Sequence, residues 1–205
     1  MNLDQIAGIA HEPKGKPTGV VVLTHGAGGS RESPMLTKIC DEWARRGWLA
    51  VRYNLPYRQR RAKGPPSGSA ANDQAGVVEA IELAHTLTEG PVIAGGHSYG
   101  GRMTSMVIAD GVATVDVLTL FSYPLHPPGK PERARTDHLP RITVPAVFTH
   151  GTADPFGTID ELRQAAALIP APTEIVEITG GRHDLGSKTI DVPALAVDAA
   201  LRLRA

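Results

Sequence analysis

The chain lacks the features that mark secreted, metal-binding and membrane proteins. It has one cysteine, Cys40, among 205 residues, so it can form no internal disulfide and no metal site built from several cysteines. Acidic and basic side chains number 21 each, and a chain without net charge has no overall field to attract nucleic acid or an anionic membrane. No apolar run is long enough to span a bilayer.

The N-terminal residues also lack the pattern of a signal peptide, because Asp4 stands where such a peptide would carry positive charge. Together these absences predict a cytoplasmic protein whose partners are small molecules, with neither nucleic acid nor a membrane among them. Cys40 lies at helical spacing from Leu36 and Trp43, so we expect its thiol to be packed in the core rather than reactive.

What the chain does have is the alternating pattern of an α/β protein. Its length and its 41% hydrophobic content suffice for one core, so we expect a single domain over residues 1–205. Apolar, β-branched segments alternate with segments of helical period. Strands are predicted at 19–26, 48–57, 91–98, 115–123, 144–151 and 173–180, and helices at 34–46, 72–87, 99–110, 158–168 and 191–204.

Two segments without any period, residues 58–70 and 124–142, are rich in proline, glycine and charge. Both are predicted to be loops. The helix that follows the first loop is expected to have Asn72 or Asp73 as its N-cap, because short polar side chains satisfy the free N–H groups of a first helical turn.

The stretch VIAGGHSYGGRM, residues 92–103, places Ser98 between two pairs of glycines where a predicted strand meets a predicted helix. Its central part, residues 96–100, matches G-x-S-x-G, the nucleophile elbow, in which a serine sits on a sharp strand-to-helix turn. The glycines relieve the crowding that side chains would cause there. The alternative is a glycine-rich turn whose serine only caps a helix. The position at the end of a parallel strand favours the elbow.

A nucleophilic serine needs an acid and a base, and in this kind of site they follow it in the order Ser, Asp, His. Asp154 follows the strand at 144–151, at the sheet edge where ligand-facing groups collect. His183 follows the strand at 173–180. We therefore predict Asp154 as the acid and His183 as the base. The competing interpretations are an Asp-Pro turn, an exposed loop histidine, and Asp184 as the acid.

The glycine-rich loop THGAGG, residues 24–29, predicts one half of an oxyanion hole. The backbone N–H groups of Ala27 and Tyr99 would stabilise a negatively charged oxygen beside the serine. The loop lacks the lysine of a phosphate-binding loop, which disfavours a nucleotide site. His25 and His97 stand beside motif glycines and are predicted to shape the substrate site. Nothing in the sequence implies a metal or an organic cofactor.

At these residues the chain resembles an α/β-hydrolase of the small, lidless, dienelactone-hydrolase-like group, from about Gly19 to its end. More narrowly, THGAGG, YNLPY, GGHSYGGRM, SYPLHPPGKPE and FTHGTADPFG are together similar to a family that includes a testis-expressed hydrolase-like protein and a subunit of the NSL chromatin complex. The resemblance implies a mostly parallel sheet of about six to seven strands with helices on both faces and no cap domain. It also implies Ser98 as nucleophile, Asp154 as acid and His183 as base, with serine where dienelactone hydrolase itself has cysteine.

A serine nucleophile favours acyl transfer, so the predicted activity is hydrolysis of carboxylic esters or thioesters of small molecules through an acyl-enzyme. The competing interpretation is a catalytically silent hydrolase fold that serves as an interaction module. Arg58 and His126, in the two predicted loops, are predicted to contact substrate. A rim of basic loop residues, Arg58 and Arg135 among them, would select substrates with an acidic group. Plain solvated loop surface is the alternative to that rim.

Overall fold

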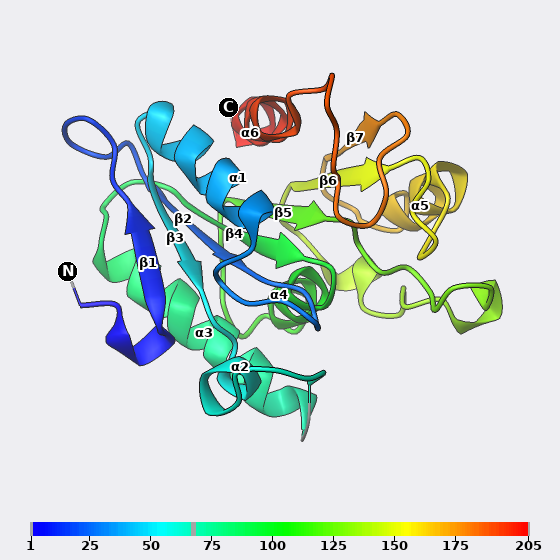
Figure 1. Ribbon diagram of the computed structural model, residues 1–205, viewed down its shortest axis with the longest axis horizontal. Coiled ribbons are helices and arrows are strands. Elements are labelled where there is room, and N and C mark those ends of the chain that lie inside the picture. The colour runs from blue at the N-terminus through cyan, green and yellow to red at the C-terminus, as the bar shows by residue number, and fades with distance from the viewer. Residues whose placement is uncertain (1, 67–68, 205) are drawn as a thin grey trace.

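The computed structural model describes residues 2–66 and 69–204 as a seven-stranded sheet flanked by helices (Figure 1). The strands are β1 (Gly8–His11), β2 (Val20–Thr24), β3 (Leu49–Tyr53), β4 (Val92–His97), β5 (Val117–Phe121), β6 (Ala146–Gly151) and β7 (Thr173–Ile178). Their order across the sheet is β1-β3-β2-β4-β5-β6-β7, with β1 antiparallel to β3 and all other pairs parallel. This is the α/β-hydrolase fold, and no cap domain is inserted within the described residues.

Helices cover both faces of the sheet (Figure 1). They are α1 (Pro34–Arg45), α2 (Pro56–Arg60), α3 (Ala70–Thr86), α4 (Tyr99–Ala109), α5 (Ile159–Ala166) and α6 (Val192–Arg204), with short 3-10 turns at Asp4–Ile6, Pro131–Arg133 and Leu139–Arg141. Side chains of α1 and α6 pack in one core cluster, and those of α3, α4 and α5 pack in the other. The sheet therefore separates two apolar layers, as parallel sheets require.

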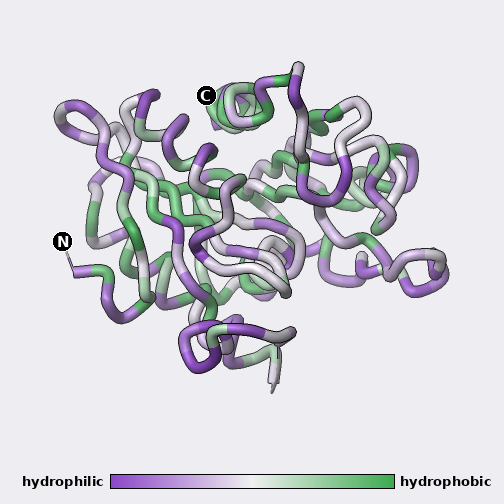
Figure 2. The backbone as a smooth tube through the Cα atoms, in the orientation of Figure 1, coloured by the Kyte–Doolittle hydropathy of each residue, from purple (hydrophilic) through white to green (hydrophobic). Residues whose placement is uncertain are grey.

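The central strand β2 shows how the sequence divides between these layers. Val21 and Leu23 pack with α1 and α6, whereas Val20 and Val22 pack against the opposite helices, because successive side chains of a strand point to opposite faces. All of β2 is buried, and Figure 2 shows the apolar residues concentrated in the central strands. No helix within the described residues is both long and apolar enough to cross a bilayer.

Cys40 is confirmed as a core residue, since its side chain is completely buried between α1 and the sheet. Burial raises the pKa of its thiol, because a thiolate is disfavoured away from water. The thiol is therefore kept in its unreactive, protonated form.

The predicted elements agree with the structure to within two residues at each end, apart from the C-terminal end of the strand predicted at 48–57, the segment before α3 and one additional strand. The additional strand is β1, whose four residues pair with β3 and are only half-buried, so they show no clear alternation in the sequence. The strand predicted at 48–57 ends at Tyr53 because Pro56 begins α2, and proline suits a first helical position.

The loop predicted at 58–70 was wrong at both ends, because α2 continues to Arg60 and α3 begins at Ala70. Residues 67–68 of that prediction lie outside the described residues. The N-cap prediction was also wrong. Ser69 is the N-cap and its side chain accepts the N–H of Ala71, whereas the buried carboxylate of Asp73 accepts the N–H of Tyr57 and the hydroxyl of Tyr99.

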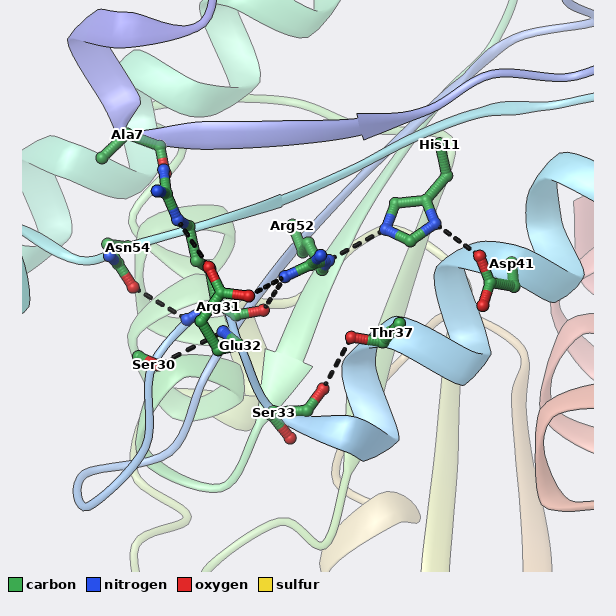
Figure 3. Close-up of polar contacts among 10 residues, drawn as sticks. All are labelled: Ala7, His11, Ser30, Arg31, Glu32, Ser33, Thr37, Asp41, Arg52 and Asn54. Atoms are coloured by element: carbon green, nitrogen blue, oxygen red, sulfur yellow. Dashed lines mark hydrogen bonds and ion pairs between the residues drawn. The ribbon is translucent and has the colours of Figure 1, made fainter.

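A network centred on Arg52 holds the loop after β2 against the edge of the sheet (Figure 3). The guanidinium of Arg52 donates to the carbonyl of Arg31 at 2.6 Å, to Glu32 at 2.9 Å and to His11 Nε2 at 2.9 Å. The other ring nitrogen of His11 donates to Asp41 on α1. Through Arg52, strand β1 thus holds the C-terminal part of this loop, at Arg31 and Glu32. The N-terminal part of the same loop, at Gly26, lies beside Ser98.

Candidate active site

Ser98 lies on the tight turn between β4 and α4. Its backbone has φ 49° and ψ −115°, a conformation that is costly for any residue with a side chain. Space around the turn is limited as well. A Cβ on Gly96 would lie 2.5 Å from the carbonyl oxygen of Thr24, and one on Gly100 would lie 2.5 Å from that of His25. Glycine at both positions therefore lets the end of β2 pack against the turn, as the G-x-S-x-G pattern predicts.

A continuous hydrogen-bonded chain joins Ser98, His183 and Asp154. His183 Nε2 lies 2.8 Å from Ser98 Oγ, and His183 Nδ1 lies 2.8 Å from Asp154 Oδ2 and 3.1 Å from Oδ1. Because an ionised carboxylate only accepts hydrogen bonds, Nδ1 carries the ring proton and Nε2 is left to accept the serine hydroxyl. The structure thus brings together the three residues that the sequence singled out from three separate strand ends.

The surroundings of Asp154 keep its carboxylate ionised and aligned. Burial would raise its pKa, but hydrogen bonds from His183 and from the N–H of Phe156 outweigh that effect and lower the pKa overall. The ring of Phe156 also packs on that of His183, with 4.3 Å between the ring centroids. Asp184, the competing acid, instead accepts the N–H of Gly186 at 3.1 Å. The position beside the imidazole therefore belongs to Asp154.

The loop after β2 holds the amide of Ala27 in one orientation. The carbonyl oxygen of Gly26 accepts hydrogen bonds from Tyr57 Oη at 3.1 Å and from His25 Nδ1 at 2.9 Å. Every peptide bond of the described residues is trans, so the N–H of Ala27 points away from that fixed carbonyl. A Cβ on Gly26 would lie 3.4 Å from the Cβ of Ser98, which places this peptide directly beside the serine.

The second predicted oxyanion-hole donor is the N–H of Tyr99, which opens α4. Amides in the first turn of a helix have no acceptor within that helix, and the helix dipole adds positive charge at this end. Ala27 and Tyr99 line the same cavity as Ser98. Two orientated amides are therefore available beside the serine for a developing negative charge.

His25 and His97 also line this cavity, but their nitrogens are used to hold its walls. His25 Nε2 accepts the N–H of Leu55 at 3.2 Å, and burial lowers the pKa of His25 to about 4, which keeps the ring neutral. His97 Nε2 donates to the carbonyl of His183 at 2.7 Å, and burial lowers the pKa of His97 as well. Both rings thus fix backbone segments that carry the site.

Arg58 and His126 lie outside the described lining of the cavity. The guanidinium of Arg58 is buried and donates to carbonyl oxygens of the two adjoining loops, those of Gly29 at 2.7 Å, Gly64 at 2.9 Å, Arg61 at 3.1 Å and Ala27 at 3.4 Å. His126 contacts Glu161 and the carbonyl of Pro127. The structure therefore does not bring these two predicted substrate contacts together with Ser98.

Residues 17–192 match the family described as alpha/beta hydrolase domain. The chain belongs to this α/β-hydrolase family. The match covers all strands except β1, and it includes the serine turn and both loops that carry Asp154 and His183.

Solved α/β-hydrolase structures show the same fold at low sequence identity. Est1E from Butyrivibrio proteoclasticus, solved with ferulic acid bound, is 15% identical, with a TM-score of 0.78 over 96% of this chain and 94% of that one. Dienelactone hydrolase from Anabaena variabilis is 21% identical, with a TM-score of 0.72 over 95% and 88%. An α/β serine hydrolase without a lid from Xanthomonas campestris is 18% identical, with a TM-score of 0.69 over 95% and 88%.

The cavity of this α/β-hydrolase has a volume of about 660 Å³ and opens beside Ser98. Two residues that line the cavity, Arg102 and Phe156, were not among the site residues predicted from the sequence. Arg102 follows Ser98 by four residues, which is about one helical turn, and that spacing was the available signal. Phe156 follows Asp154 by two residues. Arg135, predicted in a basic rim, does line the cavity.

Within the described residues, no three His, Cys, Asp or Glu side chains lie close enough together to hold a metal ion.

Proposed function

We propose that this α/β-hydrolase is a serine hydrolase that cleaves carboxylic esters or thioesters of small molecules through an acyl-enzyme. The observation that carries the proposal is the hydrogen-bonded chain from Ser98 through His183 to the buried carboxylate of Asp154. A hydroxyl, a neutral imidazole and an ionised carboxylate in this order make a weak nucleophile reactive.

In the first half of the reaction, Ser98 Oγ attacks the carbonyl carbon of the substrate while His183 Nε2 takes the hydroxyl proton. Asp154 holds the imidazole in the required tautomer and stabilises the imidazolium that forms. The amides of Ala27 and Tyr99 donate to the oxyanion of the tetrahedral intermediate. When that intermediate collapses, the alcohol or thiol leaves with the proton from His183, and the acyl group stays on the serine.

In the second half, His183 takes a proton from a water molecule as that water attacks the acyl-enzyme. Collapse of the second tetrahedral intermediate releases the carboxylic acid, and the proton returns to Ser98 Oγ. No step needs a group other than water and the residues named, so the chemistry balances with substrate and solvent alone.

The proposal is tested by covalent labelling and by turnover. Wild-type protein is incubated with a fluorophosphonate probe and separately with 4-nitrophenyl esters of two, four, six and eight carbons. We expect labelling at Ser98 and release of 4-nitrophenol, with neither in Ser98→Ala. Ser105→Ala, which removes the hydroxyl of a serine within α4, is the matched control and should be labelled like wild type. Folded wild-type protein that is neither labelled nor active would support the interaction-module alternative instead.

The remaining sequence expectations belong to the same proposal. We propose a single domain over residues 1–205 that works in the cytoplasm on small-molecule substrates, without nucleic acid or a membrane as partner. The narrower similarity to the family of the testis-expressed protein and the NSL complex subunit also stays a prediction. An assay of thioesters beside oxygen esters of the same acyl chain separates the two substrate classes.

A further inference from the structure

Two arginines, Arg102 on α4 and Arg135 in the segment after β5, line the cavity that contains Ser98. Arg102 lies on the first turn of the helix that the serine opens, since its N–H donates to the carbonyl of Ser98 at 2.9 Å. Arg135 reaches the same cavity from a different strand end. Their positions place two permanent positive charges beside the proposed nucleophile.

The donors of these two side chains are far from satisfied. Arg102 Nε is buried and has no hydrogen-bond partner within the described residues, and leaving such a group unpaired is costly. Arg135 donates from Nη1 to the carbonyl of Pro124 at 2.9 Å, but a guanidinium has five N–H donors. No carboxylate among the described residues forms an ion pair with either arginine.

No negatively charged side chain in the described lining of the cavity balances these two positive charges. Its described lining contains two arginines and no acidic residue: His25, Gly26, Ala27, Gly28, Gly29, Ser33, His97, Ser98, Tyr99, Arg102, Pro124, Arg135, Phe156 and His183. Burial, together with the neighbouring charge of Arg102, lowers the pKa of Arg135. Two cations therefore repel each other in a partly buried place, a cost that an anion between them would relieve.

Arg135 is held in position for such a role. Its N–H donates to the carbonyl of Leu125 at 2.8 Å, and its carbonyl accepts the hydroxyl of Tyr123 at 2.7 Å. These bonds fix the backbone from both sides while leaving the outer donors of the guanidinium free for a ligand. Fixed planar guanidinium groups suit bidentate recognition of an oxoanion.

We propose that Arg102 and Arg135 form a subsite for an oxoanionic group of the substrate, so that the preferred substrates are esters or thioesters that also carry a carboxylate. This inference rests on the proposed function, because it names the substrate class of the same site. It differs from a basic rim of loop residues, since one member comes from the helix behind the serine and Arg58 takes no part.

The test compares two 4-nitrophenyl esters of equal chain length, the hydrogen adipate, which carries a free carboxylate, and the hexanoate, which does not. We expect wild type to favour the adipate ester in kcat/KM by about tenfold or more, the size of one charge-assisted hydrogen bond. Arg135→Gln and Arg102→Gln should each lower that ratio by about tenfold. Arg133→Gln, which removes an exposed charge of the same segment, is the matched control and should leave the ratio unchanged.

Turnover of the hexanoate ester tests the proposed function, whereas the ratio between the esters tests the subsite. A wild-type ratio near one, or a ratio unchanged in both glutamine variants, overturns the subsite even if the hexanoate is hydrolysed.

If neither ester is turned over, calorimetry with the Ser98→Ala variant and two methyl esters still decides the matter. Monomethyl adipate should bind about tenfold more tightly than methyl hexanoate, and Arg135→Gln should remove the difference. Equal affinities overturn the proposal. Since Arg102 is partly buried and its substitution can affect folding, the Arg135 variant alone suffices for this decision.

Discussion

Two hydrogen-bonded serine–histidine pairs are found among the described residues, and they have the same length but different surroundings. Ser98 Oγ lies 2.8 Å from His183 Nε2, and Ser105 Oγ lies 2.8 Å from His138 Nε2. Ser98 and His183 both line the cavity, whereas Ser105 and His138 are buried and are not part of its described lining. The hydroxyl of Ser105 also donates to the carbonyl of Arg102 at 2.9 Å.

The difference shows that polarity, not distance, separates a candidate nucleophile from a structural contact. A serine has one hydroxyl proton. With that proton given to the carbonyl of Arg102, His138 Nε2 must donate to Ser105 and cannot act as its base. His183 has the opposite polarity, because Asp154 accepts its Nδ1 proton and leaves Nε2 as an acceptor. The carboxylate is therefore the deciding partner.

The largest expected effect comes from removing the two hydroxyl groups separately. Ser98→Ala should lower kcat/KM for 4-nitrophenyl esters by at least about 10⁴-fold, because the nucleophile is lost. Ser105→Ala should leave kcat/KM within about threefold but lower the free energy of unfolding by about 1–3 kcal/mol, since His138 loses a buried partner. Ester kinetics and urea unfolding measure the two quantities. Comparable losses of activity in both variants would remove the distinction between the pairs.

A second prediction tests the carboxylate itself. Asp154→Asn should lower kcat by about 10³- to 10⁴-fold, because an amide donor favours the tautomer in which Nε2 of His183 carries the proton. Asp184→Asn is the matched control, since its carboxylate accepts only a nearby backbone N–H, and it should be close to wild type. A larger loss in Asp184→Asn would reassign the acid.

The buried pair of Ser105 and His138 should make the free energy of unfolding depend on pH in the acid range. Burial, then the charges of Arg102 and Arg141, lower the pKa of His138 from 6.5 to about 4. Between these values the unfolded chain binds a proton that the folded chain does not, so the free energy of unfolding falls as pH falls through this window. The contribution is of the order of 3 kcal/mol.

Urea unfolding of wild type and of His138→Gln at pH 7, 6, 5 and 4.5 measures this contribution. The slope with pH should be smaller in the variant, although the buried His25, whose pKa is also lowered to about 4, keeps part of it. His85→Gln changes an exposed histidine and serves as the control. An unchanged slope in His138→Gln would mean that folding does not lower the pKa of this ring.

The smallest predicted effect concerns the loop beside the first pair. The single hydroxyl proton of Tyr57 is shared between the carbonyl oxygens of Ala27 at 2.8 Å and Gly26 at 3.1 Å, so Tyr57→Phe should loosen the peptide that presents the Ala27 amide. We expect kcat to fall by about tenfold with a smaller change in KM, because the amide acts mainly in the transition state. Gln59→Ala on the same helix is the control. A loss of thermal stability without a change in kcat would show that Tyr57 serves only the fold.

Much of the fold was predictable, because parallel strands buried on both faces appear as nearly continuous apolar runs, as β2 does. The strand β1 was not, since an edge strand of four half-buried residues shows no periodicity. Local motifs predicted Ser98, Asp154 and His183 because each lies in the short segment that follows a strand. From the sequence, Arg58 was placed at the substrate site and Arg102 was overlooked. Whether an arginine side chain binds backbone carbonyls, as Arg58 does, or is left without a partner, as Arg102 Nε is, depends on the packing of loops from different strands.

The positive φ of Ser98 places two opposing requirements on one residue, a low-energy backbone and a side-chain hydroxyl. Glycine would occupy this backbone conformation at a lower energetic cost, yet it has no hydroxyl. At the turn between β4 and α4, the most stable sequence would therefore lack the hydroxyl on which the proposed reaction depends. Engineering that selects this protein for heat resistance alone would be drawn toward changes at the turn, and would need an activity screen alongside to keep the serine.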